Sequence, residues 1–96
     1  MPNRLVAIRS SDVMWSEEGD HTLIHNFRTG NTVTLEKEEM LAWRLVNGRR
    51  TIDSIAEIVS RRIPRGSSQA KSKTIELLQQ LQKSQMLRFR SAGRQS

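Results

Sequence analysis

The sequence predicts an α+β domain in which a three-stranded antiparallel sheet packs on three helices. Three observations support this fold class. Residues 32–35 alternate between polar and apolar, which is the period of a strand with one buried face, and residues 13–16 and 21–27 form two further strand-like runs between turns. From residue 36 onwards, apolar residues recur three and four positions apart, which is typical of amphipathic helices. The chain has 96 residues, enough for one domain and too few for two ordinary ones.

Each expected strand is bounded by residues that favour turns. The first strand covers residues 13–16, and Gly19 supplies a left-handed position in the turn that follows. The second strand covers residues 21–27. The third covers residues 32–35, after a turn at 28–31, and is rich in β-branched residues. A meander of these three strands leaves the third strand at an edge of the sheet.

The first two helices have recognisable ends. A helix is expected over residues 36–47, because its first turn is acidic and Gly48 follows its last residue. Trp43 and Leu45 lie on its apolar stripe and are expected in the core. Thr51 is expected to cap the second helix.

The third helix completes the predicted fold. It is expected to begin at Ser67 or Ser68, after Pro64 stops the second helix, and to be closed by residues 86–87. Three strands followed by three helices form a winged-helix-like arrangement.

The predicted domain does not use the whole chain. It is expected to span residues 12–90. Residues 1–11 are expected to be an N-terminal lead-in, of which residues 5–8 can add a short strand or an arm. Residues 91–96 are expected to form a flexible tail.

The charge is divided unevenly along the chain. The net charge is +6, with −3 on residues 1–40 and +9 on residues 41–96. A basic C-terminal half suggests an anionic partner, which is a nucleic acid, a membrane surface or an acidic peptide, although a solvated basic face gives the same pattern. The chain contains no cysteine, which excludes disulfides and thiolate chemistry. With no targeting segment or membrane span apparent, a cytoplasmic protein is expected.

Catalysis finds little support in the residues. His21 and His25 share one face of the second strand, but no third metal ligand accompanies them. Residues 48–51 contain Gly48 but lack the spaced glycines and the lysine of a phosphate-binding loop. The chain is therefore expected not to be an enzyme, and to need neither a metal nor a cofactor.

Nucleic-acid binding is an alternative that the fold class allows. In a DNA-binding winged helix, the third helix enters the major groove and basic residues meet phosphates. Here the later part of that helix carries mainly glutamine, and the N-terminal hairpin contains Glu17, Glu18 and Asp20. These residues argue against a nucleic acid as the partner.

Several residues follow one another in a characteristic order: Thr29-Gly30, then Leu35, and then the stretch from Trp43 to Ile55, with Asn47-Gly48 and Thr51-Ile52 inside it. This ordered combination resembles the PqqD-like family of recognition elements for ribosomally made, post-translationally modified peptides. The resemblance covers residues 12–90. Gln85 departs from the family pattern, because it stands where a glycine is usual.

The resemblance implies a fold of three antiparallel strands on three helices, and also a role. Members bind the leader of a precursor peptide and present it to a modifying enzyme, often a radical S-adenosylmethionine enzyme. The leader adds as a strand beside the third strand and lies against the third helix, a binding mode that an open strand edge allows. Carried over to this chain, the peptide-binding residues are Thr32, Val33, Thr34, Leu35, Lys71, Thr74, Ile75 and Leu78.

Three functions therefore remain open: a module that binds an acidic or mixed leader peptide, a winged-helix nucleic-acid binder, and a scaffold subunit of an enzyme. For Ile75 and Leu78, a place in the core is as good an explanation as contact with the leader. For Lys71, a solvated face is as good an explanation as a charge partner. The exposed edge strand also permits a homodimer.

Overall fold

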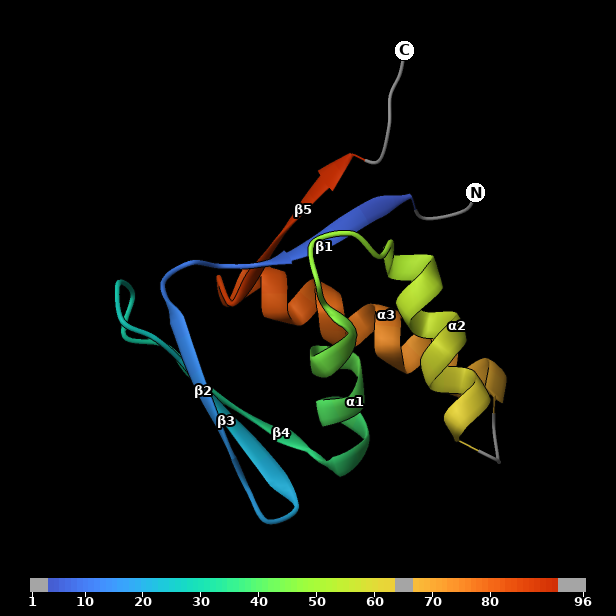
Figure 1. The fold of residues 1–96 in the computed structure, drawn as a ribbon, viewed down its shortest axis with the longest axis horizontal. Coiled ribbons are helices and arrows are strands. Elements are labelled where there is room, and N and C mark those ends of the chain that lie inside the picture. Colours follow the sequence, from blue (N-terminus) through green and yellow to red (C-terminus); the bar gives the residue numbers. More distant parts are fainter. Residues whose placement is uncertain (1–3, 64–66, 92–96) are drawn as a thin grey trace.

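The computed structural model describes residues 4–63 and 67–91. In chain order its elements are β1 (Leu5–Arg9), β2 (Val13–Glu18), β3 (His21–Asn26), β4 (Thr32–Glu36), α1 (Lys37–Leu45), α2 (Ile52–Arg62), α3 (Ser67–Lys83) and β5 (Leu87–Ser91). The predicted α+β fold, with three antiparallel strands packed on three helices, is confirmed (Figure 1). Within the described residues, no helix is both long and apolar enough to cross a membrane.

The strands β2, β3 and β4 form one antiparallel sheet in that order. The side chains of Thr22, Ile24 and Asn26, which alternate along β3, are buried. The two turns of the meander contain Gly19 and Gly30, whose φ angles of 64° and 81° lie in the left-handed region that glycine tolerates best. The three helices lie on one side of this sheet (Figure 1).

The helices bury the faces that their spacing predicts. Trp43 is 1% exposed and Leu45 is 9% exposed, which confirms both as core residues. The Thr51 side chain accepts a hydrogen bond from the Ser54 backbone N–H at 3.1 Å, so the predicted cap of α2 is also confirmed. The core combines residues of all three helices with Ile24 and residues from both sheets.

The predicted ends of two helices are wrong. The helix α1 ends at Leu45 rather than at residue 47. The Asn47 side chain accepts hydrogen bonds from the backbone N–H groups of the following residues 49 and 50, which favours a turn over a further helical turn. The helix α3 ends at Lys83 rather than at residues 86–87. There Gln85 takes a left-handed φ of 65°, and the Met86 N–H donates to the Leu81 carbonyl oxygen at 2.8 Å. This Schellman arrangement ends the helix.

After this turn the chain forms β5, which the sequence analysis did not predict. The strand β5 pairs antiparallel with β1, so residues of the expected lead-in form a second sheet with residues 87–91, of which only Ser91 belongs to the expected tail. Val6 and Ala7 of β1 are buried. The other edge of β1 meets the loop before α2, where the Gly48 N–H donates to the Ala7 carbonyl oxygen at 3.2 Å. Both edges of β1 are therefore hydrogen-bonded, one to β5 and the other to the loop before α2.

An aromatic cluster of Trp15, Trp43 and Arg9 links β1 and β2 to α1. The rings of Trp15 and Trp43 meet edge to face with centroids 5.5 Å apart. The Arg9 guanidinium lies over both rings, at 4.3 Å and 4.9 Å from their centroids, and donates to the Trp43 carbonyl oxygen at 2.7 Å. Burial lowers the pKa of Arg9 from its ordinary value.

Candidate functional site

The strand β4 is an open edge of the larger sheet, because β3 is its only sheet neighbour in the described part of the chain. Across the hairpin, the Asn26 N–H donates to the Asn31 carbonyl oxygen at 2.9 Å. In an antiparallel ladder the direction of the backbone groups alternates from residue to residue. The backbone groups of Val33 and Leu35 therefore point toward β3, and those of Thr32 and Thr34 point outward.

The outward ladder has a defined end. The Glu36 N–H, which would continue it, donates instead to the Glu39 carboxylate at 2.9 Å. These two residues form the capping box that begins α1. Thr32 and Thr34 remain as the residues of β4 that can offer both an N–H and a C=O to an added strand.

The side chains on β4 alternate as the sequence predicts. Leu35 is 1% exposed and Val33 is half-buried against the core, whereas Thr32 and Thr34 are exposed. The Thr32 hydroxyl shares a hydrogen bond of 2.8 Å with His25 on the neighbouring strand. The inner face of β4 thus anchors the strand, and its outer face stays accessible.

A pocket begins where β4 runs into α1. Its volume is about 480 Å³, and it is bounded by the start of α1, the end of α2 and the middle of α3. Ala42, Val59 and Leu77 supply apolar surface, while the rim carries charges of both signs. The complete lining is Glu36, Lys37, Glu38, Glu39, Ala42, Val59, Ile63, Lys73, Thr74 and Leu77. Glu36, the last residue of β4, belongs to this lining, so the open edge of β4 ends at the pocket.

The structure brings only one of the four predicted residues of α3 to this pocket. Thr74 lines it, although its hydroxyl donates to the Ala70 carbonyl oxygen at 2.8 Å and the residue is 5% exposed. Leu78 is fully buried in the core, and Ile75 packs against the core. Lys71 is turned toward α2.

Lys71 forms an ion pair with Glu57 of α2, with 2.7 Å between its Nζ and the carboxylate oxygen. The hydrogen bond from Lys71, and then its charge, lower the pKa of Glu57 from its ordinary value. Lys71 therefore bridges α2 and α3 at the surface, on the flank of α3 away from the pocket.

Two residues that the sequence analysis did not name face the pocket instead, Lys73 and Leu77. They lie four positions apart on α3 and so share one face of that helix. Lys71 and Lys73 are two positions apart, which turns them about 200° from each other around the helix axis. The i, i+4 spacing of Lys73 and Leu77 was the available signal, but it does not say which flank of α3 faces β4.

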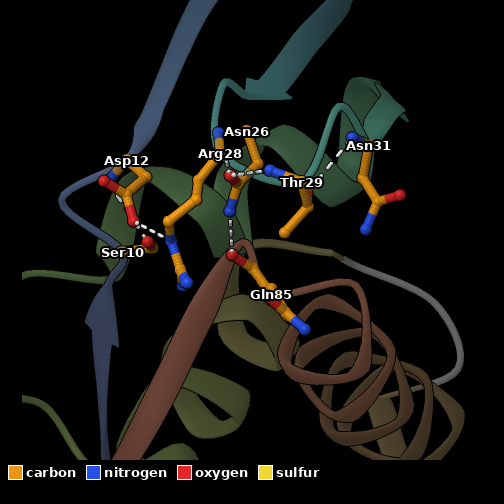
Figure 2. A network of polar contacts seen from close by, with 7 residues as sticks. All are labelled: Ser10, Asp12, Asn26, Arg28, Thr29, Asn31 and Gln85. Atoms are coloured by element: carbon orange, nitrogen blue, oxygen red, sulfur yellow. Dashed lines mark hydrogen bonds and ion pairs between the residues drawn. The ribbon is translucent and has the colours of Figure 1, made fainter.

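A network of polar contacts joins the start of β4 to the end of α3 (Figure 2). Asn26 Nδ2 donates to the Gln85 carbonyl oxygen at 2.7 Å, and Asn31 Nδ2 donates to the Ser84 carbonyl oxygen at 3.1 Å. The Asn26 Oδ1 accepts from the backbone N–H groups of Arg28 and Thr29, which shapes the β3–β4 turn. This network fixes the position of β4 relative to α3 at that end.

The predicted histidine pair does not form a recognisable metal site. In the residues that the structure describes, no group of three or more potential metal ligands lies together. His21 approaches Asp20 at 3.4 Å, and His25 contacts Thr32. Each histidine thus has a local polar contact.

The fold and the open edge together define a small α+β domain with a strand edge beside a helix-lined pocket. No protein-family model matches the chain, and no curated protein matches it. Among solved structures, the chain is similar to TbiB1 in complex with the TbiA(β) leader peptide. The TM-score is 0.72 at 15% sequence identity, over 83% of this chain and 93% of that one. This similarity shows that the two proteins share a fold.

Proposed function

We propose that this protein binds the leader of a ribosomally synthesised precursor peptide, by adding the leader as a strand to β4. The observation that carries the proposal is the open edge at Thr32 and Thr34, which ends at a pocket of about 480 Å³. Strand addition uses outward backbone groups for affinity and neighbouring pockets for specificity. TbiB1, which shares the fold, is in complex with a leader peptide.

In this proposal the chain acts as a PqqD-like peptide chaperone and has no catalytic role of its own. It presents the bound precursor to a modifying enzyme, for which a radical S-adenosylmethionine enzyme is one candidate. Thr32, Val33, Thr34 and Leu35 form the pairing strand, and Thr74 belongs to the opposite wall. Ile75, Leu78 and Lys71 support that wall through the core and through α2.

The direct test uses short precursor peptides encoded beside the gene of this protein. Their leaders are titrated by fluorescence anisotropy, and amide hydrogen exchange is followed by NMR. Binding in the micromolar to high-nanomolar range, about −8 to −10 kcal/mol, is expected. Binding should slow the exchange of the Thr32 and Thr34 amides. A leader that binds without protecting either amide would contradict strand addition to β4.

A further inference from the structure

A second open strand edge lies on β5, in the smaller sheet. The Ser10 N–H donates to the Met86 carbonyl oxygen at 3.0 Å across the β1–β5 ladder. Because backbone direction alternates, the even-numbered residues of β5 point toward β1, and the backbone groups of Phe89 and Ser91 point outward. Within residues 4–63 and 67–91, no backbone hydrogen bond from outside the ladder reaches either of these two residues.

Two arginines of β5, Arg88 and Arg90, lie on one face of this sheet. Arg88 is exposed, lies opposite Ile8 in the ladder, and has no ion pair within the described part of the chain. Arg90 is also exposed and uses one guanidinium nitrogen to donate to the Gly48 carbonyl oxygen at 3.2 Å. Arg49 is also exposed, in the loop on the far side of β1 from this edge. The surface around β5 is therefore positively charged.

The geometry of the ladder gives Arg88 a particular place. On a strand added to β5, the residue opposite Arg88 would occupy a non-hydrogen-bonded position, because the backbone of Arg88 is already turned toward β1. Side chains approach one another most closely at such positions, and opposite charges there are stabilising. A carboxylate opposite Arg88 would complement it.

We propose that β5 is a second docking edge, which takes an extended acidic segment of a partner protein with a carboxylate opposite Arg88. A polypeptide supplies both the acceptor and the donor that the outward N–H and C=O groups of Phe89 and Ser91 require. A phosphodiester backbone supplies acceptors alone, so the edge favours a protein over a nucleic acid. The inference does not rest on leader binding, since β5 and β4 belong to different sheets and lie apart in the molecule (Figure 1).

The test uses a labelled short peptide that alternates threonine and glutamate, with a threonine–lysine peptide as its control. At about 0.15 M salt, where charges more than about 8 Å apart are largely screened, the acidic peptide should bind and the basic one should not. Binding should slow amide exchange at Phe89 and Ser91 and leave Thr32 and Thr34 unchanged.

Three variants sharpen the test. Arg88→Glu should weaken binding about five- to tenfold, because it replaces an attraction with a repulsion. Arg62→Glu makes the same charge change at an exposed site at the end of α2, and should alter binding less than about twofold. Ser91→Pro removes one outward N–H without breaking a bond to β1, and should weaken binding while the melting curve is kept.

Three results would overturn the proposal. The first is equal binding by Arg88→Glu and Arg62→Glu, and the second is peptide binding without protection of Phe89 and Ser91. The third is sequence-dependent binding of duplex DNA that Arg88→Glu abolishes, which would assign this face to nucleic acid.

Discussion

Proline substitutions at two adjacent positions of β4 separate folding from peptide binding. The Val33 N–H points toward β3, opposite Ile24, so Val33→Pro removes a ladder bond and leaves a buried carbonyl oxygen unpaired. Such a loss costs about 1–3 kcal/mol. In a domain of this size each kcal/mol lowers Tm by about 4–8 °C, so a decrease of about 4–24 °C is expected.

The neighbouring substitution, Thr34→Pro, should leave the fold intact. Its N–H points outward, and an edge strand tolerates proline at such a position. The variant should melt within about 4–8 °C of the parent, which corresponds to about 1 kcal/mol. Its affinity for the leader should fall about tenfold, because one hydrogen bond is lost and the ring occupies the place of the added strand.

Circular dichroism melts and anisotropy titrations with the leader measure the two effects. Thr34→Ala is the matched control: it removes the side chain, keeps the N–H, and should bind within about twofold of the parent. The reasoning is refuted if Thr34→Pro folds and binds like the parent, since β4 would then not be the pairing strand. It is also refuted if Thr34→Pro unfolds the domain while Val33→Pro does not.

Four further substitutions test other parts of the structure. Trp43→Ala should cost about 3–5 kcal/mol by opening a cavity in the core, and a variant that melts like the parent would contradict that placement. Gln85→Gly should stabilise the domain by about 1 kcal/mol in urea titrations, because glycine accepts the left-handed φ of 65° more readily. Lys71→Ala should weaken leader binding at most a few-fold, and a larger loss would place Lys71 in the site. Glu57→Gln should lower stability at neutral pH; because the folded pKa of Glu57 lies below its ordinary value of 4.5, the parent's advantage should vanish in melts as pH falls through that folded pKa.

The local features of the fold were predictable because neighbouring residues determine them. The strand β4 follows from alternation, the start of α2 from Thr51, and the turns from Gly19 and Gly30. The strand β5 was missed because its partner β1 lies at the other end of the chain. Residues 86–87 are apolar and so resemble the end of the α3 stripe. The left-handed turn at Gln85 separates them from that helix.

In the candidate site, too, the features set by neighbouring residues were predictable, and those set by distant contacts were not. The open edge and the alternation of Thr32 to Leu35 followed from the order of the strands. The outward direction of the Thr34 N–H did not, because it depends on the hydrogen bond that closes the hairpin. The wall that α3 presents depends on how this helix packs: with Leu78 and Leu81 buried in the core, Lys71 faces Glu57 of α2 and Lys73 faces the pocket.

The edge-to-face pair of tryptophans has a consequence for spectroscopy. Trp15 and Trp43 are the two tryptophans of the chain, and they lie in contact with each other and with the Arg9 cation. Trp15 is on β2, at the opposite edge of the sheet from β4. Intrinsic fluorescence and the near-ultraviolet dichroism of the coupled indoles will therefore follow unfolding closely. They will respond weakly to a peptide that adds to β4, so unlabelled protein reports its own melting and a binding assay needs its dye on the peptide.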